Sequence, residues 1–144
     1  MKTQFIPAPG RDVDHFGRVP EIKWSGLVFP SGLIRLRRGS KETFGVKHIW
    51  HRHQRQVMVG QKPDVSPTEA VAFYVAKLLR PRTPIYCEGG GFDERQPLLA
   101  VNSWLGTVVL QCQTPRREAP YYSIVTAFER RTPYGTLLGQ ILEE

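Results

Sequence analysis

The stretch Phe44-Gly-Val-Lys-His-Ile-Trp-His-Arg-His-Gln-Arg-Gln-Val57 contains three of the four histidines in the chain and no acidic residue. Read as a helix at about 100° per residue, it divides into an apolar arc of Val46, Ile49, Trp50 and Val57 and a basic face of His48, His51, Arg52 and Arg55. His53 falls inside the apolar arc, about 140° from His48. This pattern predicts a helix that packs its apolar arc against a core and presents cations outward.

The chemistry of this helix allows three interpretations. A metal centre needs ligands that converge on one point, but these histidines diverge around the helix and the stretch contains no Asp, Glu or Cys, so we expect no metal and no other cofactor. A solvated basic helix with one inward, hydrogen-bonded histidine is the structural alternative. The catalytic alternative is RNA cleavage, in which one imidazole takes the 2′-hydroxyl proton, another protonates the departing 5′ oxygen, and arginines hold the phosphate.

Length and charge limit the possibilities further. At 144 residues the chain is long enough for one domain with its own core, and we expect residues 1–22 to form a linker or arm and residues 23–144 a single nuclease-like domain. The net charge of +7 favours an anionic partner, with nucleic acid ahead of an acidic protein and a membrane surface last. The sequence has no apolar run of membrane-spanning length and no secretion signal at its start.

The remaining segments predict one more helix and a sheet. Residues 24–29 and 33–37 are expected to form a hairpin around Pro30-Ser31-Gly32, and Ser40 or Thr43 is expected to cap the central helix. Ser66-Pro67-Thr68-Glu69 has the pattern of a capping box and starts a helix within residues 64–80. Strands are expected at 83–88, 96–102, 106–113 and 121–128, with a mobile tip at Gly89-Gly90-Gly91 and a short helical cap in 133–141. The predicted fold class is α+β, with an antiparallel sheet of four to five strands and two helices packed on one face.

The last predicted strand carries further candidate residues. Alternation places Thr126 on the same strand face as Tyr122, Ile124 and Phe128, so its hydroxyl either fills space or donates beside the histidine helix. At the end of this strand, Arg130 and Arg131 add capacity for binding phosphate. Cys87 and Cys112 are expected to be buried free thiols.

Two of these motifs, in this order, resemble the barnase/EndoU/colicin/RelE-like nuclease superfamily, in particular its phage and polymorphic-toxin branches. They are Gly45-Val-Lys-His48-Ile-Trp-His-Arg52-His53 and Ile124-Val-Thr126-Ala-Phe128. The resemblance implies a metal-independent ribonuclease with this superfamily's fold, in which His48 and His53 match the motif histidines, Arg52 the basic position and Thr126 the strand hydroxyl. His51 is additional to the pattern. The two catalytic histidines could act together only if the helix bends or ends between them.

The functional prediction is a toxin endoribonuclease that cuts RNA, with tRNA as the expected substrate, by 2′-hydroxyl transesterification. Catalysis is assigned to His48, His53 and Thr126, and substrate binding to Arg52, Arg55, Arg130, Arg131 and Tyr122. The resemblance also implies delivery as part of a larger secreted effector, as in contact-dependent growth inhibition, action in the target-cell cytoplasm, and an acidic cognate immunity protein. The free domain is expected to be a monomer without a membrane partner. A non-catalytic nucleic-acid-binding module and a phage-associated adaptor protein are the alternatives.

Overall fold

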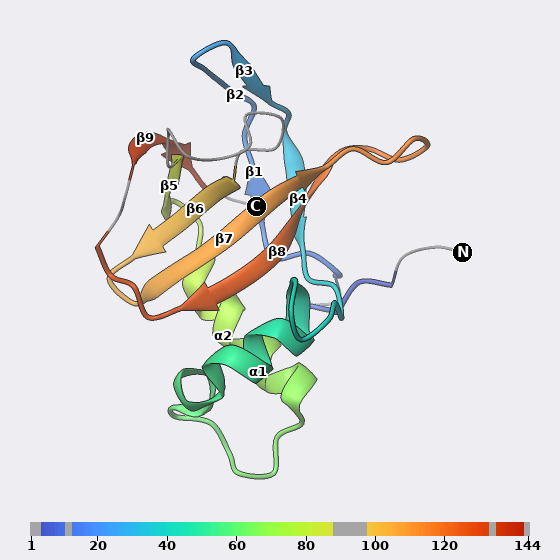
Figure 1. Ribbon diagram of the computed structural model, residues 1–144, viewed down its shortest axis with the longest axis vertical. Helices are drawn as coiled ribbons and strands as arrows, with labels where there is room; N and C mark the ends of the chain where they lie inside the picture. The colour runs from blue at the N-terminus through green and yellow to red at the C-terminus, as the bar shows by residue number, and fades with distance from the viewer. Residues whose placement is uncertain (1–3, 11–12, 88–97, 133–134, 143–144) are drawn as a thin grey trace.

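The computed structural model describes residues 4–10, 13–87, 98–132 and 135–142. These residues form two helices, a large sheet and a separate two-stranded sheet (Figure 1). The elements are β1 (Arg18–Val19), β2 (Ile22–Trp24), β3 (Leu27–Phe29), β4 (Gly32–Arg35), α1 (Gly45–Met58), α2 (Pro67–Leu78), β5 (Pro84–Cys87), β6 (Leu98–Ser103), β7 (Gly106–Gln113), β8 (Tyr121–Phe128) and β9 (Thr136–Gln140). The α+β class is therefore confirmed.

The predicted sheet of four to five antiparallel strands is wrong. The main sheet has seven strands in the order β1-β4-β8-β7-β6-β5-β9, and β4 runs parallel to β8. Its two edges approach each other, because the Leu142 N–H, just after β9, donates to the Arg18 carbonyl in β1 at 3.0 Å. The sheet is consequently a nearly closed, barrel-like structure. The sequence predicted too few strands because β1 and β9 are short and defined by long-range pairing, and because β4 was expected to pair within a hairpin rather than with β1 and β8.

The expected hairpin is also wrong, since its two arms belong to different sheets. The turn lies at Ser25-Gly26, where both residues have positive φ, and it joins β2 to β3. β4 leaves this hairpin and enters the main sheet between β1 and β8. In Figure 1 the β2–β3 hairpin projects from the end of the molecule opposite the helices.

Both helices begin close to where they were predicted. In α2 the Ser66 hydroxyl accepts a hydrogen bond from the Glu69 N–H at 3.2 Å, which confirms the predicted cap. In α1 the cap prediction is wrong, because the hydroxyls of Ser40 and Thr43 bond to each other and no side chain caps the helix. The backbone carbonyls of Arg37 and Arg38 accept from the N–H groups of the first turn of α1 instead.

The two chain ends contribute to the large sheet. β1 lies within the segment expected to be an arm, where Phe16 and Val19 are buried. The helical cap expected in 133–141 is wrong, because β9 pairs with β5 there. Cys87 and Cys112 are free, as predicted, although Cys112 is only partly buried. The Gly89-Gly90-Gly91 tip lies outside the described residues.

Register in β7 and β8 decides which side chains share a face. Cys112 pairs with Tyr122 and Leu110 with Ile124, but a bulge then shifts the register so that Val109 pairs with Thr126. Directly paired residues point to the same side of a sheet, so the bulge places Thr126 on the face opposite Ile124. The prediction that Thr126 shares a face with Tyr122 and Ile124 is therefore wrong.

Candidate functional site: histidine, hydroxyl and arginine between α1 and β8

Helix α1 packs against β8 beyond the point where β4 ends. Within β8, only Tyr121, Tyr122 and Ser123 pair with β4. The second half of β8 therefore has α1 rather than β4 beside it. In Figure 1 α1 lies directly below this strand. The buried residues Ile49 and Val57 hold the helix there, in agreement with the predicted apolar arc. The topology thus brings the histidine helix to the strand that carries Thr126.

The helix is kinked at His53, whose backbone angles are φ −132° and ψ 27°. A regular helix would keep His48 and His53 about 140° apart around its axis. His48 and His53 could act together only if the helix bends or ends between them. The observed bend lies at His53 itself. The kink changes the direction of the helix at the residue that faces β8.

Two of the predicted residues lie near the Phe128 ring, and a third stands on the same strand face. The His53 and Phe128 rings have centroids 5.7 Å apart at an interplanar angle of 32°, and the Arg130 guanidinium carbon lies 5.4 Å from the Phe128 ring centroid. Thr126 stands two residues before Phe128 on the same strand face, because no register shift separates them. We call the group of His53, Thr126, Phe128 and Arg130 the α1–β8 site.

The hydroxyl of Thr126 has no hydrogen-bond partner among the described residues, although its oxygen is buried. A buried hydroxyl without a partner costs free energy, so such groups are uncommon in folded proteins. At a functional site an unpaired donor is available to a ligand. An unpaired hydroxyl in β8, the strand beside α1, is what the donor interpretation of Thr126 requires.

The end of β8 is held in place by hydrogen bonds that the sequence did not predict. The Glu129 N–H donates to the Gln56 side-chain oxygen at 2.7 Å, which ties the strand to α1. The Arg130 carbonyl accepts from the Asn102 amide at 2.9 Å and from the Thr107 hydroxyl at 2.6 Å. These contacts fix the backbone on which Phe128 and Arg130 stand. No sequence signal identified Gln56, because its partner lies 73 residues away.

The environment of His53 lowers its pKa from the usual 6.5. Partial burial removes water from the imidazolium and is the largest cause, and positive charge on His48 and Arg52 adds to it. His53 therefore favours its neutral form at pH 7, in which one ring nitrogen carries a lone pair. A neutral imidazole is the form that a general base requires.

Measuring the His53 pKa in charge variants should separate the effect of burial from the effect of nearby positive charge. We expect an NMR-detected pKa below 6.5 in the native protein and a higher value in Arg52→Gln, which still remains below 6.5 because burial persists. Arg55→Gln removes the same charge from the same helix and is the matched control, since Arg55 is not among the causes of the shift. Folding releases a proton from a group with a lowered pKa, so the free energy of unfolding should also fall as pH drops below 6.5. An unchanged His53 pKa in Arg52→Gln would contradict the electrostatic assignment.

His48 lies outside the α1–β8 site but is oriented by the backbone. Its Nδ1 is 3.0 Å from the Lys41 carbonyl oxygen. A carbonyl can only accept, so Nδ1 carries the hydrogen and Nε2 is left to exchange a proton with a ligand. His48 is close enough to His53 for its charge to affect the His53 pKa.

The other predicted binding residues occupy different environments. Arg52, Arg55 and Arg131 are exposed. Tyr122 is 0% exposed, and its hydroxyl donates to the Pro30 carbonyl at 2.7 Å. Tyr122 is in the core and its hydroxyl already has an acceptor. Its predicted role in substrate binding therefore does not fit its position.

Comparison with protein-family models, curated proteins and solved structures found no match. Within the described ranges, no group of three or more His, Cys, Asp or Glu side chains is placed to hold a metal ion. Neither α1 nor α2 is long and apolar enough to cross a membrane. The geometry and charge of the α1–β8 site are therefore the observations from which a function can be inferred.

Proposed function

We propose that this protein is a toxin endoribonuclease that cleaves RNA by attack of a ribose 2′-hydroxyl on the adjacent phosphate, without a metal. The observation that supports this most is the α1–β8 site, where an imidazole with a lowered pKa and a guanidinium lie near the Phe128 ring, and an unpaired buried hydroxyl stands two residues before this ring on the same strand face. These are the three kinds of group that the reaction needs: a base, a neutral hydrogen-bond donor and a cation for the phosphate.

Each group has a definite role in the proposed reaction. Neutral His53 takes the proton of the 2′-hydroxyl, and the 2′ oxygen forms a bond to phosphorus. The bond from phosphorus to the 5′ oxygen of the next nucleotide breaks, and protonated His48 gives its Nε2 proton to that oxygen. The products are a 2′,3′-cyclic phosphate and a free 5′-hydroxyl, so protons and bonds balance. Thr126 and Arg130 stabilise the charge on the non-bridging phosphate oxygens.

The surrounding charge supports an RNA substrate. Lys47, Arg52 and Arg55 stand on α1, which has no acidic residue in its first turn or anywhere in its sequence. A surface of this kind attracts the phosphate backbone and makes binding sensitive to salt. We extend the proposal to tRNA as substrate, to delivery within a larger effector that acts in the target-cell cytoplasm, and to an immunity protein with a carboxylate-rich surface that protects the producing cell.

The decisive experiment is incubation of the purified protein with total bacterial RNA in excess EDTA, with Thr126→Val and Thr126→Ser in parallel. The native protein should produce discrete fragments that end in cyclic phosphates. Thr126→Val is nearly the same size and removes an unpaired hydroxyl, so it should fold at least as stably and yet cleave more slowly, by about 10²–10³-fold if the hydroxyl stabilises the transition state. Thr126→Ser retains the hydroxyl and should keep much of the activity.

Two outcomes would overturn parts of the proposal. Intact RNA after incubation with folded, inhibitor-free protein would reject the nuclease, and salt-dependent binding without cleavage would favour a nucleic-acid-binding module. Cleavage by Thr126→Val at the native rate would leave the nuclease but remove Thr126 from its mechanism.

A further inference from the structure

A groove of about 740 Å³ lies along α1, beside the loop that precedes the helix. On the helix side it is lined by Lys47, Trp50, His51 and Gln54, which are spaced so that they form a single stripe. On the loop side it is lined by residues 40–42. None of these residues belongs to the α1–β8 site. The groove includes His51, the histidine that the nuclease motif does not account for.

Trp50 gives this groove a flat, rigid wall. Its indole is partly buried and packs against the hydrophobic core, while it also lines the groove. A tryptophan held on one side by a core loses little conformational freedom when a planar group stacks on its other side. Stacking of unpaired bases on aromatic side chains is the usual way in which proteins hold single-stranded RNA.

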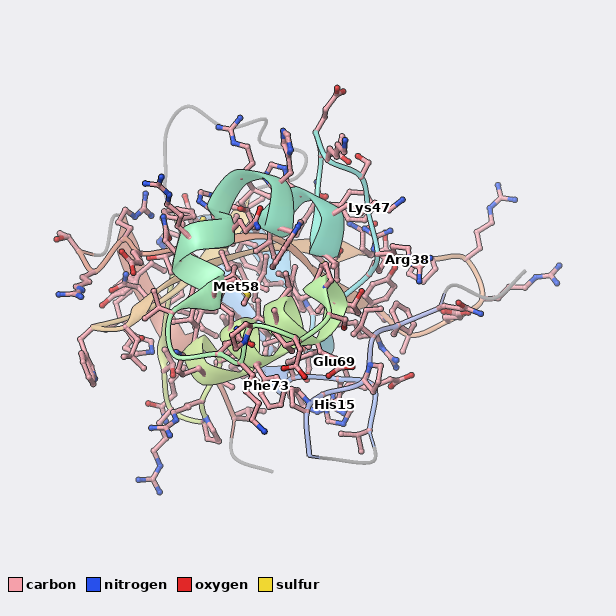
Figure 2. The ribbon with its side chains drawn as sticks, turned by 90° about the horizontal axis from the view of Figure 1, so that it is seen from below. His15, Arg38, Lys47, Met58, Glu69 and Phe73 are labelled. Atoms are coloured by element: carbon pink, nitrogen blue, oxygen red, sulfur yellow. The ribbon has the colours of Figure 1, made fainter. Side chains whose placement is uncertain are left out.

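Two lysines and one glutamate line the groove around this wall. Lys41 and Lys47 line it from its two sides and Glu42 lines the loop side, so the charged side chains of the lining sum to a positive charge. The Lys47 N–H donates to the Arg38 carbonyl at 3.0 Å, and Figure 2 shows the two residues beside each other at the start of α1. Arg38 lines a second hollow, of about 470 Å³, that shares Ser40 with the first. The positive charge therefore continues past the end of the groove.

The loop wall is held to α1 by His48. Its Nδ1–H donates to the Lys41 carbonyl at 3.0 Å, so the residue proposed as general acid also fixes one side of the groove. A nucleotide in the groove would lie beside the face of α1 that carries His48. The opposite wall offers His51 and Gln54, whose side chains can donate and accept hydrogen bonds at a base edge.

We propose that this groove binds one unpaired nucleotide of the RNA substrate next to the cleaved bond, with its base stacked on Trp50 and its phosphates beside Lys41 and Lys47. This inference rests on the proposed function, because it names a subsite for the same RNA. It assigns His51 and Gln54 to recognition of the base and separates them from catalysis at His53.

The test measures RNA binding and cleavage separately. Binding of a fluorescent single-stranded RNA octamer is measured by anisotropy in the His53→Ala background, in which the RNA should stay intact. Trp50→Leu should weaken binding about five- to hundredfold, the range found for loss of one stacked base. Trp104→Leu is the matched control, because Trp104 is 76% exposed and lies outside the groove; it should leave binding unchanged. Trp50→Phe retains packing and a smaller ring, and should show a smaller loss with a native melting temperature.

Charge and kinetics provide the second part of the test. The double variant Lys41→Gln and Lys47→Gln should reduce the slope of log Kd against log salt by about 1.4, as expected for two phosphate contacts to a single strand. With His53 intact, Trp50→Phe should raise KM more than it lowers kcat. Native RNA affinity in both Trp50 variants would overturn the subsite even if the protein cleaves RNA. Conversely, Trp50-dependent binding with no cleavage by the native protein would support the subsite and reject the nuclease.

Discussion

Replacing His53 by alanine is expected to slow RNA cleavage by about 10²–10⁴-fold, the usual contribution of a general base. The lowered pKa keeps His53 neutral at pH 7, and its ring lies against Phe128 beside Thr126, where the 2′-hydroxyl would be positioned. The variant loses a ring contact at a partly exposed position, so the fold should survive. The measurement is the single-turnover cleavage rate, with circular dichroism and thermal unfolding as tests of structure.

His51→Ala is the matched control for this prediction. It removes an imidazole two residues away on the same helix, from the groove rather than from the α1–β8 site. We expect an increase in KM with little change in kcat. A native cleavage rate in folded His53→Ala, or an equal loss of kcat in both variants, would remove His53 from the role of base. The native rate should also decline as pH falls below the lowered His53 pKa, because protonation removes the lone pair.

Gly45→Ala is expected to cause a large loss of stability. Gly45 has φ +83°, and a Cβ at this position would overlap the Arg37 carbonyl oxygen. The close approach is required because the Val46 N–H donates to that carbonyl at 3.0 Å and the Lys47 N–H to the next one. These two bonds replace the missing side-chain cap of α1. We expect the free energy of unfolding to fall by more than about 3 kcal/mol, from backbone strain together with steric overlap.

Gly60→Ala separates the two causes of this loss. Gly60 has φ +78°, close to that of Gly45, but a Cβ there would meet no atom within 4 Å. Strain alone should cost about 1–2 kcal/mol in Gly60→Ala. Urea unfolding of both variants provides the comparison. Equal losses would show that contact with the Arg37 carbonyl does not matter. A folded Gly45→Ala protein should also lose cleavage activity, because the shifted start of α1 would displace His48 and His53.

The sequence predicted local elements most accurately where periodicity was strong. β7 and β8 span the predicted residues, and α2 begins at the predicted serine cap. Such elements follow from side-chain alternation and from capping groups a few residues apart, which the sequence shows directly. The short strands β1 and β9 were not predicted, and β4 was predicted with the wrong partner, because the strands that pair with them lie far away in sequence.

The candidate site was predicted in part. His53, Thr126 and Arg130 were selected from residue type and motif. The structure places His53 and Arg130 near the Phe128 ring and Thr126 two residues before Phe128 on β8. Tyr122 was selected because it shared a strand with Thr126, but burial places it in the core. The bulge after Ile124 explains why alternation misplaced Thr126, since one extra residue reverses the face of everything that follows it. No pattern in a single strand reveals a bulge.

Residue type and spacing were enough to predict the α+β class, the basic histidine helix, its apolar arc and the approximate limits of the central strands. These features depend on interactions between residues close in the chain, whose energies follow from side-chain type and spacing. Long-range packing was needed to place α1 beside β8, to bend the helix at His53, and to line a groove with Trp50 and two lysines. Those features depend on contacts between distant segments, and such contacts arise only when the whole sheet closes around its core.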